Sequence, residues 1–336
     1  RFSECFPSWL CSILLFVSSF TMFMAGLIAN FEFDLKKIIA LSTLSQLGLM
    51  MSILALGEVV LSFFHLLMHA LFKALLFMCA GFMIHVMSGC QDIRYMGSAM
   101  STLPMISCFF NISNMALCGL PFLSGFYSKD LILEIMSVGY LSSYVYVVFY
   151  LTTGLTVMYS LRLLYYTLVG GLNMGGLMMV GEAGYFMIKG MGGLLFFVIL
   201  GGGILSWLVF PSPYFICLSG EMKVLVLLVI IVGGMMGGVI ASKGYFFSLR
   251  VNLGLMTFFG SMFNLSNLSS LGVNYYFLIL GDEALDGLDQ GWSEYLGSMN
   301  IFMLIKGSTE VVQSMMSVNL KIFLVLLFVW LCILFM

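Results

Sequence analysis

The sequence predicts an all-α integral membrane protein with about eight transmembrane helices, one of them broken, plus a long C-terminal amphipathic lateral helix. Three observations lead to this fold class. The 336 residues are 62% hydrophobic and only 8% charged, their mean hydropathy is +1.12, and long apolar runs recur along the chain. A soluble globular chain averages about 25% charged residues. A chain with only 8% charged residues cannot cover a water-exposed surface. The net charge of −2 argues against nucleic acid as a partner, because phosphate binding needs clustered Lys and Arg.

Eight segments have the length and apolarity of a membrane crossing, which needs about 20 mostly apolar residues. In chain order they are Ser8 to Ala29, Ile38 to Gly57, Val59 to Val86, Leu103 to Met136, Tyr140 to Leu164, Lys189 to Phe210, Glu221 to Ala241, and Leu320 to Met336. Residues 1–241 are therefore expected to form a transmembrane helix bundle, and residues 320–336 a C-terminal anchor helix.

The intervening residues 242–319 are expected to form a loop and an amphipathic lateral helix, the latter between Gly281 and Asn319. One face of this helix is acidic, with Asp282, Glu283, Asp286 and Asp289. The other face is apolar at helical spacing, with Leu285, Leu288, Trp292, Tyr295, Leu296, Met299, Phe302 and Met303. Helices that bind anionic lipid usually carry Lys and Arg on the polar face, so the acidic face favours a protein partner over lipid headgroups.

The basic residues in or beside the connections are distributed unevenly between the two sides of the predicted bundle. One side carries Lys36, Lys37, Arg94, Arg162, Lys189, Lys243 and Arg250, whereas Lys223 alone lies on the other. The positive-inside rule places the basic side on the cytoplasm-like face, which for an organelle is the matrix face.

A stripe of ionisable residues lies on the third crossing, where His65, His69 and Lys73 follow at intervals of four residues. Each step turns the helix face by only about 40°, so the three side chains share one face. A lysine at the bilayer centre costs about 2.5–3.5 kcal/mol on insertion scales, and Lys73 lies too deep for easy snorkelling. One interpretation is that the histidines are core residues whose hydrogen bonds are satisfied inside the bundle. The three residues together favour proton transfer, because neutral histidine both donates and accepts and titrates near neutrality.

The fourth crossing is expected to break at Gly119 and Pro121, since proline lacks an N–H and clashes with the preceding turn. Lys129 and Asp130 follow inside or beside the helix. Many transporters build an ion site at mid-membrane depth from a broken helix with ionisable groups beside the break. A helix that merely ends at Pro121, with Lys129 in an interfacial loop, would explain the same residues.

Ser45 and Gln46, with the neighbouring Ser42 and Thr43, make a polar band on the second crossing. Such residues could line a hydrated path. Hydrogen bonds between helices explain them equally well, and the sequence does not choose between the two.

The sequence contains no G-x-G-x-x-G, no P-loop and no cysteine cluster suited to iron–sulfur ligation. These motifs bind dinucleotides, nucleotide phosphates and redox clusters. No cofactor-binding residues and no metal site are therefore predicted in this chain.

Four motifs resemble those of one family of membrane proteins. They are Asp34–Gly48 (DLKKIIALSTLSQLG), His65–Ala74 (HLLMHALFKA), Gln91–Gly97 (QDIRYMG) and Leu120–Asp130 (LPFLSGFYSKD). In order and approximate spacing they resemble NADH-ubiquinone oxidoreductase chain 5, an antiporter-like membrane subunit of respiratory complex I. Chain 4 of that complex and the large subunits of multisubunit cation/proton antiporters share much of the pattern. The lysine after the helix break and the C-terminal amphipathic segment favour chain 5.

The resemblance implies proton translocation coupled to quinone reduction in other subunits of a proton-translocating NADH:ubiquinone reductase. It implies that Lys73 is the central lysine of a half-channel, fed by His65 and His69. Lys129 would then be the terminal lysine near the exit, with Asp130 as its modulator. It also implies a multi-pass protein of the mitochondrial inner membrane. Other subunits would bind NADH, FMN, the iron–sulfur clusters and ubiquinone, and the lateral helix would pack along neighbouring membrane subunits.

The sequence departs from the family pattern at its start. The family has an earlier half-channel with a glutamate–lysine pair, and further crossings before the helix that begins at Ser8. The chain begins at Arg1, so we expect an N-terminally incomplete copy. Two other functions fit the sequence: a stand-alone cation/proton antiporter subunit, and a purely structural membrane subunit that holds its neighbours through the C-terminal helix.

Overall fold

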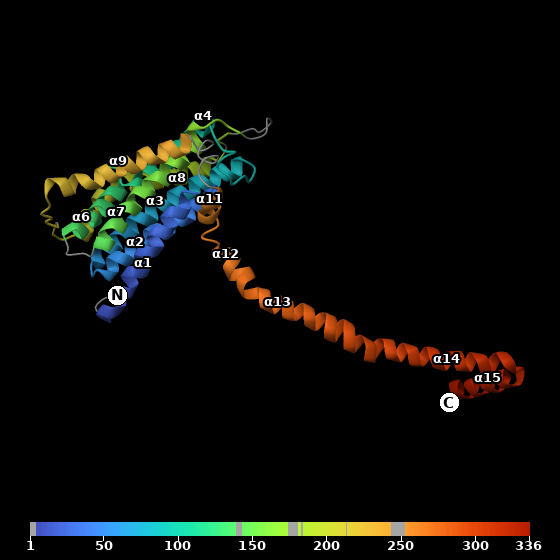
Figure 1. The fold of residues 1–336 in the computed structure, drawn as a ribbon. Coiled ribbons are helices and arrows are strands. Elements are labelled where there is room, and N and C mark those ends of the chain that lie inside the picture. Colours follow the sequence, from blue (N-terminus) through green and yellow to red (C-terminus); the bar gives the residue numbers. More distant parts are fainter. Residues whose placement is uncertain (1–4, 139–142, 174–180, 183, 213, 243–252) are drawn as a thin grey trace. The chain divides into compact units, whose positions relative to one another are not determined.

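The computed structural model describes residues 5–138, 143–173, 181–182, 184–212, 214–242 and 253–336. They divide into two units, Arg1–Phe263 and Asn264–Met336 (Figure 1). The described ranges are helical and contain no strand, only an isolated bridge between Asp34 and Asp92. The predicted all-α class is confirmed. Lys243, Arg250 and the expected helix start at Tyr140 lie outside the described residues.

The first unit is a helix bundle whose bounds differ from the predicted crossings by a few residues. Its helices are α1 (Ser8–Ala29), α2 (Leu35–Ala55), α3 (Val59–Val86), α4 (Ala99–Thr102), α5 (Pro104–Cys118), α6 (Ser124–Val138), α7 (Ser143–Leu164), the π-helical η2 (Tyr165–Val169), α8 (Tyr185–Val209), α9 (Gly220–Ser242) and α11 (Leu253–Gly260). Because α2 begins at Leu35, Lys36 and Lys37 lie in its first turn, directly beside the connection that precedes it.

The first unit extends to Phe263. The physical reason is aromatic packing by α11. The rings of Phe31 and Phe259 stack with their centroids 5.2 Å apart, and Phe263 packs against the main hydrophobic core.

In the described part of the chain, six helices are long and apolar enough to cross a membrane. They are α1, α2, α3, α8, α9 and α7 with its extension η2. Two of the eight expected crossings are shorter as single helices. The fourth is divided into α5 and α6, and the eighth, α15 (Leu320–Phe335), has 16 residues.

The division between α5 and α6 follows from the backbone at Gly119 and Pro121. Gly119 ends α5 in the left-handed region, with φ of 84°, a conformation that glycine adopts without steric cost. Pro121 lies between the two helices and cannot donate a backbone hydrogen bond. At the start of α6, Gly125 lies so close to the Ala116 carbonyl of α5 that a Cβ would collide with it. The two half-helices are therefore packed directly against each other.

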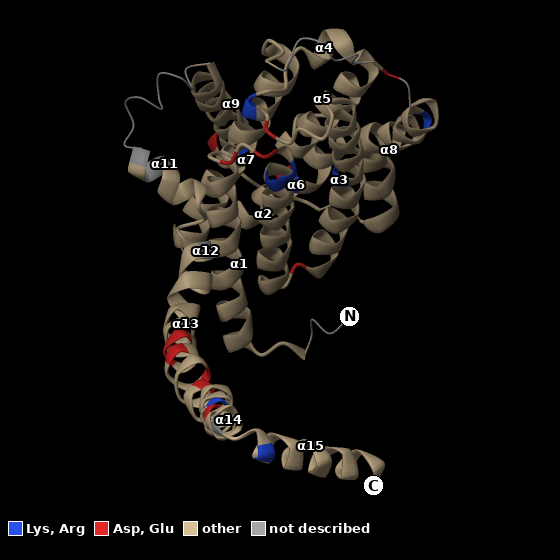
Figure 2. Ribbon diagram, turned by 90° about the vertical axis from the view of Figure 1, so that its right-hand side faces the viewer, with Lys and Arg blue, Asp and Glu red and all other residues tan. Residues whose placement is uncertain are grey.

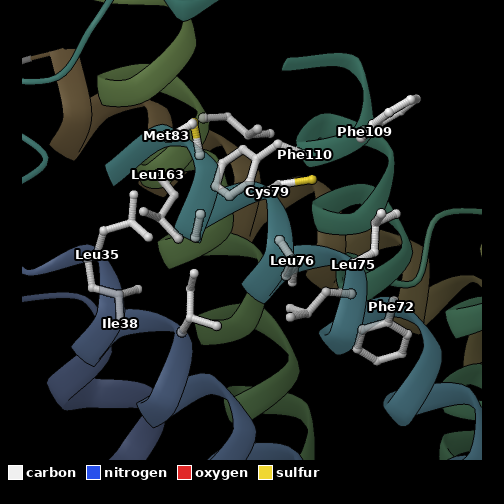
Figure 3. Close-up of a cluster of buried hydrophobic side chains, with 14 of the residues drawn as sticks. Leu35, Ile38, Phe72, Leu75, Leu76, Cys79, Met83, Phe109, Phe110 and Leu163 are labelled. Carbon is white, nitrogen blue, oxygen red and sulfur yellow. The ribbon is translucent and has the colours of Figure 1, made fainter. Parts of the chain in front are cut away.

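Helix α3 lies at the centre of the bundle, between α2, α5, α6 and α8 (Figure 1). Figure 3 shows Phe72, Leu75 and Leu76 of α3 in one hydrophobic cluster with Ile38 of α2, which lies across the view beyond Leu76. These side chains are at most 1% exposed. Such burial fixes the rotation of α3 about its axis, and thereby the direction in which its polar stripe points.

One end of the bundle brings together the charged loop residues Asp34, Asp92 and Arg94. The bridge between Asp34 and Asp92 joins the loop before α2 to the loop after α3. Arg94 forms an ion pair with Asp92 at 2.5 Å, and hydrogen bonds from Arg94 hold the pKa of Asp92 below its usual range. Lys189 lies near the start of α8, and Lys223 lies near the start of α9. Figure 2 shows that most of the ribbon carries neither basic nor acidic residues.

Arg162 lies in the last turn of α7 and is buried. Its guanidinium donates to the Asn30 carbonyl at 2.5 Å and lies within 3.4 Å of the Ala29 carbonyl. These carbonyls end α1, where the helix dipole favours a cation. The ring of Phe33 lies between two guanidinium groups, 4.8 Å from Arg162 and 4.3 Å from Arg94.

We expect Arg162→Met to lower the stability of this end of the bundle. The variant keeps an apolar stem but leaves the Asn30 carbonyl without its charged donor, and hydrogen bonds to charged groups are worth about 1.5–3 kcal/mol. The measurement is the thermal unfolding midpoint of the purified complex. Lys189→Met, which replaces an exposed cation, is the control. An unchanged midpoint for Arg162→Met would show that the contact to α1 contributes nothing.

The second unit is a long, largely exposed run of helix. It comprises α12 (Leu265–Asn267), η3 (Leu268–Gly272), α13 (Val273–Ala284), η4 (Leu285–Ser293), η5 (Tyr295–Met299), α14 (Asn300–Val318) and α15. The helix thus begins before the expected start at Gly281. The segments η4 and η5 are π-helical, with i→i+5 bonds. The α-helical spacing that predicts an acidic face and an apolar face therefore does not hold in these segments.

Candidate functional site

The stripe on α3 faces the interior of the bundle. The exposed fractions of His65, His69 and Lys73 are 1%, 9% and 4%. Burying a charge is costly unless it is paired or hydrogen-bonded, so the contacts of these three side chains decide what they can do. Their orientation excludes the arrangement in which Lys73 reaches toward lipid or an interface.

Lys73 is held by the polar band on α2. Its Nζ donates a short hydrogen bond to the Ser42 hydroxyl and lies 3.4 Å from the Ile39 carbonyl oxygen. Ser42 in turn donates to the same Ile39 carbonyl at 2.7 Å. These partners are neutral, and no carboxylate contacts the amine among the described residues. Lys73 is therefore solvated by oxygen atoms without being neutralised, as a group that takes up and releases a proton requires.

His65 connects three helices through its two ring nitrogens. Nε2 lies 3.2 Å from Gln46 Oε1 on α2, and Nδ1 lies 3.0 Å from Ser128 Oγ on α6. Since Gln46 Oε1 can only accept, this geometry places the ring proton on Nε2 and leaves Nδ1 to accept from Ser128. Ser128 immediately precedes Lys129, so His65 joins the α2 band to the broken helix.

Lys129 lies inside the bundle and not in an interfacial loop. It is 4% exposed, and its Nζ donates to the Thr156 hydroxyl of α7 at 2.7 Å. The Thr156 hydroxyl in turn donates a hydrogen bond to the Thr153 carbonyl at 2.7 Å. Asp130, the adjacent residue, is only partly buried. The break at Gly119 is what allows α6 to present Lys129 to α7 at this depth.

His69 occupies the position between His65 and Lys73 on the stripe. The two imidazole rings lie 6.4 Å apart, and the ring of Phe72 packs edge-on against His69 at 5.4 Å. The Nε2 atom of His69 is buried and has no hydrogen-bond partner among the described residues. A buried polar atom of this kind is commonly satisfied by internal water.

The ionisable groups lie close enough to influence one another. His65 is within electrostatic reach of His69 and Lys129, and His69 is within reach of Lys73. Protonation of any one group therefore disfavours protonation of its neighbour. Chemically, the site can hold a proton at one of several positions and transfer it along hydroxyl, imidazole and amine groups.

Of the predicted site residues, the structure brings together Lys73, Lys129, His65, His69 and Gln46. Ser45 is buried beside them but donates to the Ser42 carbonyl at 2.9 Å, and Thr43 does not point inward. Sequence reasoning missed the α7 residues of the site, a polar stripe at four-residue intervals made of Thr152, Thr156 and Ser160. The spacing rule that identified the histidines would have found this stripe as well.

No group of three or more His, Cys, Asp or Glu side chains suited to a metal ion occurs in the part of the chain that the structure describes. The thiol of Cys118 instead pairs with the Ser160 hydroxyl at 2.8 Å.

Two family descriptions match adjoining parts of the chain. "NADH:quinone oxidoreductase/Mrp antiporter, TM" matches residues 1–156, which contain both lysines and both histidines of the site. "NADH dehydrogenase subunit 5 C-terminus" matches residues 159–336.

Curated relatives and solved structures agree with these matches. The chain is 49% identical to NADH-ubiquinone oxidoreductase chain 5 of Anopheles gambiae over 100% of its own length and 58% of the relative's. It is 47% identical to chain 5 of Anopheles quadrimaculatus, over 98% of this chain and 57% of the relative. The fold is similar to that of a chain in the Mrp complex from a Dietzia species, with a TM-score of 0.62, 19% identity, and coverage of 90% of this chain and 34% of that one. A chain of an archaeal membrane-bound sulfane sulfur reductase gives a TM-score of 0.51 at 20% identity, covering 69% and 44%.

Proposed function

The chain belongs to the NADH dehydrogenase subunit 5 family, and from this premise we propose that it is a proton-translocating membrane subunit of respiratory complex I. It would reside in the mitochondrial inner membrane as a multi-pass protein. Because the chain spans 57–58% of the length of the curated relatives, the activity proposed is that of the whole subunit, to which these residues contribute.

The observation that carries the proposal is the buried run of titratable and hydroxyl groups from α2 to α7. Lys73 binds Ser42, His65 contacts Gln46 and Ser128, and Lys129 binds Thr156. A purely structural bundle would gain nothing from burying two lysines without carboxylates, since an isolated buried charge is strongly unfavourable.

We assign the path as a relay in which protons pass between Lys73 and Lys129 by way of His69, His65 and Ser128. Water is expected to bridge His69 to its neighbours, because its Nε2 is buried and has no partner among the described residues. Asp130 would modulate Lys129, and Ser45 and Gln46 would support the path from α2. Redox chemistry would belong to other subunits, which bind NADH, FMN, the iron–sulfur clusters and ubiquinone.

The proposal also assigns about eight crossings to the chain. The half-helices α5 and α6 together would make one crossing, with its break at mid-membrane depth, and α15 would make the last. The helical run of the second unit would lie laterally against other membrane subunits of the complex and against lipid, because its described apolar side chains are exposed within this chain.

The test replaces Lys129 by methionine in the intact complex, reconstituted into sealed vesicles and driven by NADH and quinone. We expect a lower ratio of protons moved to electrons transferred, with electron transfer largely kept. The measurement combines a pH-sensitive dye with the NADH oxidation rate. Lys189→Met is the matched control, since Lys189 is exposed on α8 and lies outside the relay. An unchanged ratio in Lys129→Met would contradict the proposal.

Two other functions make opposite predictions in the same system. A stand-alone antiporter subunit would exchange sodium for protons without NADH or quinone, and we expect no such exchange. A purely structural subunit would tolerate Lys129→Met but lose assembly when residues 282–316 are deleted.

A further inference from the structure

Tyr159 on α7 is a buried hydroxyl group that the relay described above does not use. The residue is 1% exposed and ranks among the largest fully buried side chains. Its hydroxyl has no well-formed hydrogen bond among the described residues. From α7, the hydroxyl faces the polar band of α2, which comprises Ser42, Ser45 and Gln46.

Tyr159 also lies beside the groups that surround Lys129. It is within electrostatic reach of the Cys118 thiol, which pairs with Ser160 and interacts with Lys129. Thr156, the partner of Lys129, precedes Tyr159 by one helical turn on α7. Tyr159 is thus near both Ser42, which binds Lys73, and Cys118, which interacts with Lys129.

The chemistry of this position is informative because a phenylalanine would fill the same space. A buried hydroxyl without a partner costs about 1–3 kcal/mol, and buried tyrosines usually find one. Packing alone therefore does not account for the hydroxyl. A hydroxyl that can turn between two sets of acceptors is suited to passing a proton between them, since it donates and accepts at the same atom.

We propose that Tyr159 forms a second branch of the relay, joining Lys73 to Lys129 through Ser42 and α7 without passing His69. The inference rests on the proposed function. A proton leaves Lys73 Nζ for the Ser42 oxygen, and the Ser42 proton moves to Tyr159 Oη. The original Tyr159 proton moves on, through water or Thr156, to the neutral Lys129 amine. One proton is transferred, and each hydroxyl ends with one proton, as it began.

Each branch has one site without a direct partner. On the α3 branch it is the Nε2 atom of His69, and on the α7 branch it is the hydroxyl of Tyr159. Lys73 contacts Ser42 directly, whereas His69 makes no hydrogen bond to either lysine among those described. Both observations fit two branches that each depend on a bridging water.

The test compares Tyr159→Phe, His69→Leu and the double variant in the intact complex, with the ratio of protons to electrons as the readout. Parallel branches predict that each single variant retains part of the translocation and that the double variant falls to the level of Lys73→Ala. Such non-additivity is the signature of coupled residues. Tyr150→Phe is the matched control, because Tyr150 on the same helix also has a buried hydroxyl without a described partner but does not face the α2 band.

The outcomes separate this inference from the function on which it rests. If the double variant behaves as His69→Leu does, Tyr159 is only a packing residue, even where Lys73→Ala still abolishes translocation. If Lys73→Ala also leaves the ratio unchanged, the proposed function itself fails and the branch with it. Assembly of Tyr159→Phe should match the wild type, because replacing an unpartnered hydroxyl with hydrogen leaves no group unsatisfied.

Discussion

Replacing Lys73 by alanine is expected to eliminate most of the proton translocation by this subunit while NADH oxidation by quinone continues in part. The effect should be the largest of any single substitution in the chain. Lys73 is the only lysine on α3, and its amine donates to the hydroxyl of Ser42 on α2.

The physical reason is the strength of charge coupling inside the bundle. At an effective dielectric constant of about 20, two unit charges about 8 Å apart interact by about 2 kcal/mol. That energy is sufficient to expel a proton from a buried amine when a neighbouring group becomes charged. Alanine removes both the proton carrier and the charge that acts on His69, so neither transfer nor coupling remains.

The measurement is the number of protons moved per electron transferred in vesicles that contain the intact complex. Lys36→Ala is the control, because Lys36 is an exposed lysine at the start of α2. If Lys73→Ala and Lys36→Ala gave the same ratio as the wild type, Lys73 would not lie on the proton path.

Gly125→Ala should have the largest effect on folding and assembly. Gly125 is buried at the start of α6, where an added Cβ would meet the Ala116 carbonyl of α5 at less than van der Waals distance. The obstacle is backbone, which cannot rotate away as a side chain can. Overpacking of this kind typically costs about 1–3 kcal/mol and occasionally more. The half-helices would separate, and Lys129, one turn further along α6, would move away from Thr156.

The expected result is a sharp decrease in the amount of assembled complex, measured by native gel electrophoresis and by the thermal unfolding midpoint. Gly203→Ala on α8 is the matched control, since its Cβ would meet nothing within 4 Å in the described chain. Alanine in a helix is favoured over glycine by about 1 kcal/mol, so the control should be neutral or slightly stabilising. Equal assembly of the two variants would show that the contact between α5 and α6 can relax.

Some features of the site could be predicted because they depend on local sequence. Residues four apart on a helix share a face whatever surrounds it, so the stripe of His65, His69 and Lys73 follows from spacing alone. The effect of Gly119 and Pro121 is equally local, because it arises from the backbone of those residues. The α7 stripe was predictable by the same rule, although its threonines and serine are less conspicuous than histidines.

Other features depended on contacts between distant parts of the chain. Ser128 lies 63 residues from His65, and Arg162 lies 132 residues from the carbonyl that it binds at the end of α1. Periodicity says that a side chain faces inward but not which helix it meets. For that reason the carbonyl groups that Arg162 binds could not be predicted from the sequence.

The sequence by itself determined that the chain is helical, rich in membrane-spanning segments and provided with ionisable groups on one face of α3. Only the tertiary structure decided that Ser42 holds Lys73, that Thr156 holds Lys129 and that Tyr159 is buried near the polar band of α2. Hydropathy and helical spacing are properties of one segment. The partner of a buried polar atom is decided by packing between segments, where the rotation and depth of each helix are set by the apolar side chains around it.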